Sequence, residues 1–279
     1  MPQLHRLNAI QNELREVLSL NQDDYRLEVT GDEIGARFID LQLRSVFQPI
    51  VDHKRGKPLG YEALLRASDS TGESISPPAA FRRAEVLERL VRFDRLTRTL
   101  HTLNFLNMGA DDALLFLNVH PDLLVAVHGH GRVFEQVLHQ HDVSTHQVVI
   151  EINESAVGEE RLLKEAVANY RDRGYRIAID DFGKEHSNLE RLWTLLPEYV
   201  KLDASIIHAA ESNDRLQRIL PKLVEIIRDL GAEVVIEGIE TQAHLDLARH
   251  AGVHLMQGYL LGRPAGITAW APAAPLEIA

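Results

Sequence analysis

The chain has 279 residues, 45% of them hydrophobic, which is enough for one large domain or two ordinary ones with a sizeable core. It contains no cysteine, which excludes disulfides, thiolate zinc sites and cysteine nucleophiles. The formal net charge of −11 argues against broad contact with a nucleic-acid backbone, so we expect no DNA partner, although a small phosphorylated ligand remains compatible with this charge. We see no basic, apolar leader and no apolar run of 18 residues, so we expect no secretory signal, no membrane span and a cytoplasmic location.

The first predicted element is a helix. Residues 4–20 carry apolar side chains at helical spacing, with polar residues between them. This helix either packs on the main domain or contacts a dimer partner or a regulatory partner. Residues 21–40 are more polar and predict a connection. We therefore divide the chain into a helix and connection over 1–40, a main domain over 41–270 and a tail over 271–279.

The main domain alternates short apolar runs with longer helical patterns. The runs predict strands at 45–51, 59–67, 113–119, 148–152, 176–180, 199–203, 233–238 and 255–261. The helical patterns lie at 76–103, 159–173, 214–230 and 242–251. Ser76 is the expected N-cap of the first, with Pro77 at its first helical position, and Pro221 is expected to kink or interrupt the third.

The alternation of strands and helices predicts the fold class. Eight strands with helical crossovers favour an α/β fold of the TIM-like (β/α)8 barrel type, with a doubly wound open sheet as the less favoured alternative. Only residues 52–58 separate the first two strands, which is too few for a parallel crossover. The first strand is therefore expected to be antiparallel to the second.

Every predicted strand carries a polar or charged residue within it or at its end. These residues are Gln48, Glu62, Asn118, Glu151, Asp180 with Asp181, Lys201 with Asp203, Glu237, and Gln257. A buried carboxylate is costly unless it is paired or binds a metal, and the carboxyl ends of barrel strands form the active site. Because the adjacent charges of Asp180 and Asp181 repel each other, a cation is expected beside them.

The types of these side chains indicate which metal would bind. Carboxylates and an amide oxygen favour magnesium, manganese or calcium over zinc or copper. One ion would take its ligands from Glu62, Asn118, Glu151 and Asp180. Asp180 would bridge to a second ion bound by Asp181, and two ions about 3.5–4 Å apart are suited to phosphodiester cleavage. Lys201 would add positive charge beside the attacking water or the phosphate, and Glu237 would hold a water network.

Each of these residues also has a purely structural interpretation. The alternatives are a helix N-cap and ion pair for Asp180 and Asp181, a salt bridge to Arg66 for Glu62, a loop-tying amide for Asn118, an ion pair for Lys201, a core amide for Gln257 and a helix cap for Glu154.

The same residues lie in motifs that resemble the EAL-domain cyclic di-GMP phosphodiesterases. In the order of that family, the motifs are FQPIV (47–51), YEALLR (61–66), FLNVHP (116–121), EINE (151–154), IDDFG (179–183), VKLD (200–203), IEGIET (236–241) and QGYLLGRP (257–264). The tripeptide Glu62-Ala63-Leu64 alone is a weak signal for this family. Eight motifs in the same order over residues 44–265 are a specific one.

The resemblance implies a barrel with one antiparallel strand, hydrolysis of cyclic di-GMP to linear pGpG in bacterial signalling, two Mg²⁺ or Mn²⁺ ions, and a homodimer. The implied ligands are Glu62, Asn118, Glu151 and Asp180 for the first ion, and Asp180 and Asp181 for the second. Lys201 and Glu237 would position the water, with Glu237 as the general base. The implied substrate contacts are Gln48, Leu65, Arg66, Asp203, Gln257 and Pro264. Glu154 would anchor the loop after the fifth strand.

One loop departs from the family pattern. After DDFG the family usually has a glycine and an aromatic residue at the positions that Glu185 and His186 occupy here, following Lys184. If the glycine needs a positive φ, a glutamate is strained there. An alternative is therefore a cyclic di-GMP receptor with weak or no turnover.

Overall fold

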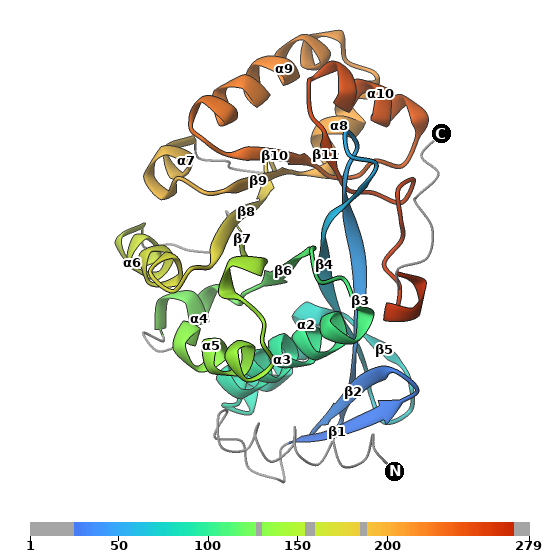
Figure 1. Ribbon diagram of the computed structural model, residues 1–279, viewed down its shortest axis with the longest axis vertical. Coiled ribbons are helices and arrows are strands. Elements are labelled where there is room, and N and C mark those ends of the chain that lie inside the picture. Colours follow the sequence, from blue (N-terminus) through green and yellow to red (C-terminus); the bar gives the residue numbers. More distant parts are fainter. Residues whose placement is uncertain (1–24, 127–129, 154–159, 185–188, 271–279) are drawn as a thin grey trace.

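The computed structural model describes residues 25–126, 130–153, 160–184 and 189–270 (Figure 1). Its strands are β1 (Tyr25–Thr30), β2 (Glu33–Phe38), β3 (Leu41–Asp52), β4 (Lys57–Ser68), β5 (Ser74–Ile75), β6 (Leu114–Asn118), β7 (Val148–Asn153), β8 (Arg176–Phe182), β9 (Tyr199–Leu202), β10 (Glu233–Ile236) and β11 (Leu255–Met256). Its α-helices are α2 (Pro77–Val86), α3 (Leu90–Met108), α4 (Pro121–Ala126), α5 (His130–Gln140), α6 (Glu160–Arg171), α7 (Leu189–Leu195), α8 (Ala204–Glu211), α9 (Asp214–Asp229) and α10 (Gln242–His250). The helix expected over 4–20 and the tail over 271–279 lie outside the described residues.

Eight of these strands close into a barrel. The sheet runs in the order β3, β11, β10, β9, β8, β7, β6, β4, and pairing of β4 with β3 completes the ring. This closure confirms the TIM-like barrel and excludes the open doubly wound sheet. Strand β3 is antiparallel to both β4 and β11, and every other neighbouring pair in the ring is parallel, so the expected antiparallel first strand is confirmed.

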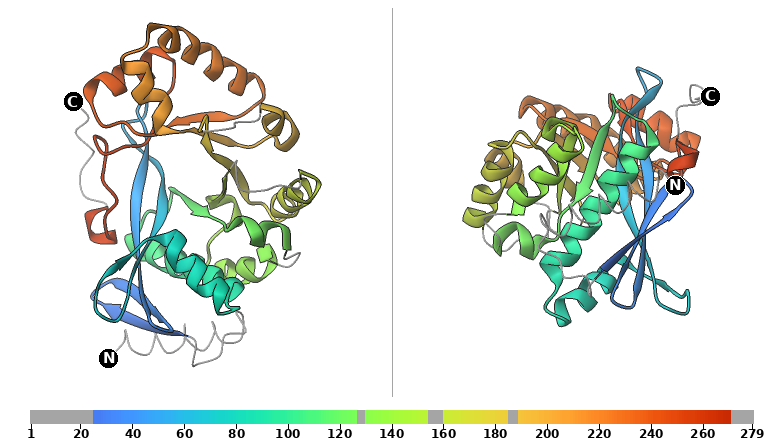
Figure 2. Two further views of the ribbon diagram at one scale, coloured as in Figure 1. Left: turned by 180° about the vertical axis from the view of Figure 1, so that it is seen from behind. Right: turned by 60° about the horizontal axis from the view of Figure 1, so that its bottom comes forward.

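The segment expected to be a connection contains a hairpin instead. Strands β1 and β2 pair with each other, and β2 pairs with β3 outside the ring. Figures 1 and 2 show this hairpin at the end of β3 and β4 that lies far from α9 and α10. Tyr25 and Leu27 alternate with exposed polar residues along β1, and this period of two is typical of a strand with one buried face.

The helices also differ in part from the expected pattern. The predicted helix over 76–103 is two helices, because the chain leaves helical geometry at Glu88, whose φ is 55°. Ser76 and Pro77 hold the expected N-cap and first-turn positions of α2. Helix α9 continues through Pro221, so the proline does not interrupt it. Within the described residues, none of the helices combines the length and the apolar character that crossing a membrane requires.

A layer of apolar side chains lies inside the barrel. Its buried residues are Ile50, Leu114, Phe116, Val149, Ala178, Tyr199, Val235 and Leu255. Side chains two positions apart on a strand share a face. On each strand, the residue two positions away along the chain therefore also faces the barrel interior. In the parallel strands, the residues two positions toward the carboxyl end form the next layer.

Gly60 leaves room for that apolar layer, and this yields a first prediction. A Cβ atom at Gly60 would lie 2.4 Å from the carbonyl oxygen of Leu114 and 2.9 Å from the Phe116 ring. We expect Gly60→Ala to lower the free energy of unfolding by about 2–3 kcal/mol, measured by denaturant titration. Gly31→Ala is the control, because its Cβ would meet nothing within 4 Å and only the positive φ of 62° opposes it, at about 1 kcal/mol. An equal cost at both positions would contradict this account.

Candidate active site

A polar layer lies directly above the apolar layer inside the barrel. It consists of Gln48, Glu62, Asn118, Glu151, Asp180, Lys201, Glu237 and Gln257. Each lies two residues from a small or apolar interior residue of its own strand, as Glu151 follows Val149 and Lys201 follows Tyr199. The strand period therefore brings these eight of the ten predicted polar residues to one end of the barrel.

Lys201 lies at the centre of this layer and is only 1% exposed. Its Nζ lies 3.1 Å from Glu62 Oε2, 2.8 Å from Glu151 Oε1, 2.9 Å from Asp180 Oδ1 and 2.8 Å from Glu237 Oε1. The ammonium group is thus the cation that the four carboxylates share in the described structure. The ion-pair interpretation of Lys201 accounts for this geometry without a substrate contact.

Three amides tie the carboxylates together. Asn118 Nδ2 donates to Glu62 Oε1 at 3.1 Å and to Glu151 Oε2 at 3.0 Å. Gln257 Nε2 donates to Glu62 Oε2 at 2.8 Å and to Gln48 Oε1 at 3.3 Å, and Gln48 Nε2 donates to the Gly262 carbonyl at 3.1 Å. A half-turn of the Asn118 amide would present its oxygen to a cation between the same two carboxylates.

The carboxylates differ in their affinity for protons. Burial raises the pKa of Glu237 to about 8, against the opposing effect of the Lys201 ammonium. Burial and the negative charge of Glu62 raise the pKa of Glu151 well above its usual value, and burial also raises the pKa of Asp180. Burial acts in the same direction on Glu62, but Lys201 and hydrogen bonds from Gln257 and Asn118 outweigh it, so the pKa of Glu62 is lowered. The site without metal therefore holds protons at neutral pH.

A bulge in β8 brings two adjacent aspartates close to the same group of carboxylates. The register with β9 shifts between Ile179 and Phe182, and Asp181 has a φ of 57°. Successive side chains of a regular strand point to opposite faces, whereas a bulge redirects one of them. Asp181 accordingly accepts a hydrogen bond of 2.7 Å from Asn153 Nδ2, and its Oδ1 lies 3.6 Å from Lys184 Nζ.

A second group of carboxylates adjoins the first. Among the described residues, Asp181, Asp203 and Glu237 each offer an oxygen within 4.8 Å of the other two, so they could hold a metal ion. Asp203 is also the N-cap of α8 and accepts a hydrogen bond of 2.9 Å from the Ser205 amide. Its carboxylate therefore has a structural role whether or not an ion binds.

These side chains fit divalent cations. Glu151 Oε1 and Asp180 Oδ1 are buried, and the close contact that the described residues give each of them is with the Lys201 ammonium, at 2.8 Å and 2.9 Å. The four carboxylates around Lys201, together with Asp181, leave a formal charge of −4, which two divalent ions would match. Oxygen ligands of this kind suit magnesium or manganese.

The remaining residues that were predicted to contact the substrate or to anchor a loop lie outside the polar layer or outside the described residues. Leu65 is buried in the main core on the face of β4 opposite to Glu62, so its side chain does not face the polar layer. Arg66 shares the face of Glu62 and is exposed; its Nη1 donates to the Leu65 carbonyl rather than to the Glu62 carboxylate. Pro264 is half-buried and precedes Ala265, which bridges to Phe47 on β3. Glu154 lies outside the described residues.

Sequence reasoning missed two residues that contact the second aspartate. Asn153 follows Glu151 by two positions on β7, so the strand period alone could have assigned it to the same face. Lys184 lies 3.6 Å from Asp181, the residue at which β8 departs from regular strand geometry, and the sequence carries no clear signal for that bulge.

The family model described as the EAL domain matches residues 34–264. The uncharacterized EAL-domain containing protein YkuI of Bacillus subtilis is 30% identical over 230 residues, which are 78% of this chain and 54% of that protein. The probable cyclic di-GMP phosphodiesterase PdeB of Escherichia coli is 27% identical over 226 residues, covering 78% of this chain and 42% of that protein. The chain thus spans about half the length, or less, of these curated relatives.

A solved structure shows the same architecture. The PaMucR phosphodiesterase, determined as a c-di-GMP complex, superimposes with a TM-score of 0.70 at 26% identity, over 81% of this chain and 93% of that one. The family match extends from β2 through the barrel to the loop after β11 and includes every residue of the polar layer. The chain therefore belongs to the EAL domain family.

Proposed function

We propose that this chain hydrolyses cyclic di-GMP to linear pGpG with two divalent cations bound at the polar end of the barrel. The observation that carries the proposal is the ring of four carboxylates around Lys201, next to the group formed by Asp181, Asp203 and Glu237. Membership of the EAL domain family and the names of PdeB and PaMucR support cyclic di-GMP as the substrate.

The residues of the chain divide the work of the reaction. Two bound divalent cations would neutralise the phosphodiester and lower the pKa of the attacking water. Glu237 is placed to accept the proton of that water, while the water oxygen adds to phosphorus and the ribose 3′ oxygen leaves. Lys201 holds the ligand carboxylates in place. We assign the nucleotide contacts to Gln48, Arg66 and the rim of the barrel.

The direct test is hydrolysis of cyclic di-GMP by the purified protein with Mg²⁺, with Mn²⁺ and with EDTA, followed by chromatography. We expect metal-dependent conversion to pGpG and none with EDTA. A nucleotide that binds but stays intact with either metal would rule out hydrolysis and leave a receptor.

Proton binding by the site predicts how metal affinity depends on pH. The pKa of Glu237 is about 8, and those of Glu151 and Asp180 are raised, so a cation must displace protons below that pH. The affinity for Mg²⁺ should therefore rise with pH through about 8, with protons released on binding. Calorimetry in buffers of different ionisation enthalpy measures this release. Equal affinity at about pH 6 and about pH 8.5, without proton release, would contradict the assignment.

One observation favours the receptor as a second candidate. The Lys184 ammonium lies 3.6 Å from Asp181 Oδ1, where it competes with a second cation for that carboxylate. We expect Lys184→Ala to tighten binding of the second ion and to raise turnover at limiting Mg²⁺ about threefold or more. Lys54→Ala, a change of the same type at an exposed position, should leave turnover unchanged. Equal Mg²⁺ dependence of the Lys184→Ala variant and the unmodified chain would remove this argument for a receptor.

A further inference from the structure

The turn after β10 carries Glu237, and its shape depends on the next residue, Gly238. Gly238 has a φ of 72°, which favours glycine, and a Cβ atom added to it would lie 2.4 Å from the Cβ of Ala204. The turn therefore passes close against the first residue of α8. Because Asp203 is the N-cap of that helix, this contact helps to set the distance between the carboxylates of Asp203 and Glu237.

Two histidines from different helices meet the carbonyl oxygen of Gly238. His208 Nε2 on α8 lies 3.0 Å from this oxygen, and His244 Nδ1 on α10 lies 3.2 Å from it. The two rings stack with 4.8 Å between their centroids, where α8 and α10 lie side by side (Figure 1). A carbonyl oxygen can only accept a hydrogen bond, so a ring nitrogen that bonds to it must carry the hydrogen. His208 therefore donates to Gly238 through Nε2.

His244 holds the same turn in either of its neutral forms. Its ring is buried, its Nδ1 also lies 3.3 Å from the Glu240 amide nitrogen, and its Nε2 lies 3.2 Å from Glu211 Oε2. With the hydrogen on Nδ1, the ring donates to the Gly238 carbonyl. With the hydrogen on Nε2, it donates to Glu211 and accepts from the Glu240 amide. The sequence favours this arrangement, because His244 is the third residue of α10 and its side chain reaches back past the N-cap, Thr241.

The peptide group between Gly238 and Ile239 is thus held from both sides. Its N–H donates to the Gln257 carbonyl at 3.0 Å on the barrel side, and its C=O meets the histidines on the helix side. Glycine has more conformational freedom than any other residue, so a peptide group beside it turns easily unless both of its ends are bonded. The carboxylate of Glu237, the residue before Gly238, moves with this peptide group.

We propose that His208 and His244 are positioning residues that hold the Glu237 carboxylate in the polar layer. Both act through the turn at Gly238, and neither belongs to the polar layer itself. The role of Glu237 as acceptor of the proton of the attacking water rests on the proposed function, whereas the hold of the histidines on the turn does not.

The position of Glu237 affects the chemical step rather than nucleotide binding. Its Oε1 lies 2.8 Å from Lys201 Nζ, and a rotation of the peptide group after Gly238 would displace the carboxylate from this contact and from the attacking water. The nucleotide contacts are assigned to other strands, at Gln48 and Arg66. Removal of both histidines should therefore lower kcat and leave KM unchanged.

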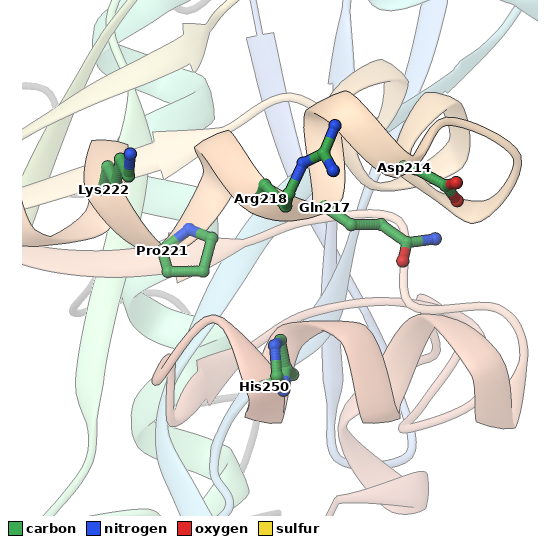
Figure 3. Close-up of a pocket in the computed structure, with 6 residues that line it drawn as sticks. All are labelled: Asp214, Gln217, Arg218, Pro221, Lys222 and His250. Atoms are coloured by element: carbon green, nitrogen blue, oxygen red, sulfur yellow. The ribbon is translucent and has the colours of Figure 1, made fainter.

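The test compares leucine and glutamine at the two positions at saturating Mg²⁺. We expect His208→Leu/His244→Leu to lower kcat about tenfold or more with KM within about twofold, because leucine cannot donate to the Gly238 carbonyl. His208→Gln/His244→Gln should stay within about threefold of the unmodified kcat, because the glutamine amide can donate there. His250→Leu is the matched control, since His250 is exposed on the same helix α10 and faces the hollow beside α9 (Figure 3). The kcat of this variant should be unchanged.

Amide hydrogen exchange followed by mass spectrometry gives a second measurement that needs no turnover. Without nucleotide or metal, peptides covering residues 237–241 should exchange faster in the leucine pair than in the unmodified chain and in the glutamine pair. Thermal unfolding checks that each variant is folded. If the leucine pair does not fold, His208→Leu alone, at an exposed position, carries the comparison with an expected loss of about threefold in kcat.

Several outcomes would overturn the proposal. They are an unchanged kcat in the leucine variant, a rise of KM in place of the fall of kcat, an equal loss with leucine and with glutamine, and unchanged exchange over 237–241. An unmodified chain without turnover would refute the proposed function instead. The exchange rates would then decide alone whether the two histidines hold the turn that carries Glu237.

Discussion

Glu62→Gln should reduce hydrolysis of cyclic di-GMP by at least about 10³-fold at saturating Mg²⁺. Glu62 accepts hydrogen bonds from Lys201, Gln257 and Asn118, and its charge belongs to the set that a divalent ion would need. The glutamine side chain has the same size, so the packing of the site changes little. It removes one negative charge, however, and turns an amide donor toward side chains that are themselves donors. Product formation by chromatography measures the effect.

Glu165→Gln provides the control for this change. Glu165 lies on the outer side of α6 and pairs with Arg161, and both residues are exposed, so its loss should leave turnover unchanged. The fold of both variants is compared by thermal unfolding. If Glu62→Gln kept a tenth of the original turnover or more, the assignment of Glu62 as a metal ligand would be wrong.

Lys201→Met should destabilise the metal-free protein by about 3–5 kcal/mol, because it leaves buried carboxylates without their cation. The pKa of Lys201 is raised well above its usual value: burial opposes the charge, but Asp180, Glu151, Glu237 and Glu62 outweigh burial. A raised pKa means that the ammonium contributes stability at every pH below its usual pKa, so the loss should be present throughout the neutral range.

Divalent cations should partly reverse this destabilisation. We expect the midpoint of thermal unfolding of Lys201→Met to rise more with Mg²⁺ than that of the unmodified chain, since the ion replaces the missing positive charge. Lys164→Met is the control, because Lys164 forms a surface ion pair with Glu160. Equal stability of Lys201→Met and Lys164→Met without metal would contradict the central role of Lys201.

The sequence was sufficient to predict the barrel and most of the polar layer. Each apolar run that predicted a ring strand contains one, because a buried parallel strand needs a short continuous apolar segment, although in the run over 255–261 only Leu255–Met256 form the strand. The period of two then fixes which residues share the interior face. The same period of two could have excluded Leu65 from the predicted substrate contacts. Leu65 is three residues from Glu62 and one from Arg66, so its side chain points to the opposite face of β4.

Other features depend on contacts that no local pattern reveals. The bulge at Asp180 and Asp181 arises where β8 meets β9, and it allows adjacent residues to lie close to the same carboxylates. The hairpin of β1 and β2 was mistaken for a connection because its exposed face is polar. The place of Lys201 among four carboxylates results from closure of the ring, which brings together residues of four strands and Glu237, the residue directly after β10.

The antiparallel β3 also has a consequence for how the barrel folds. Strands β3 and β4 pair along almost their whole length, and only a short turn separates them. Contacts between residues close in sequence form at a low cost in loop entropy, whereas each parallel pair must wait for a helix to cross over. We therefore expect this hairpin to form early in folding, before the parallel strands join it. Gln48 and Glu62 face each other within it, so this order would bring the first two residues of the site together before the barrel closes.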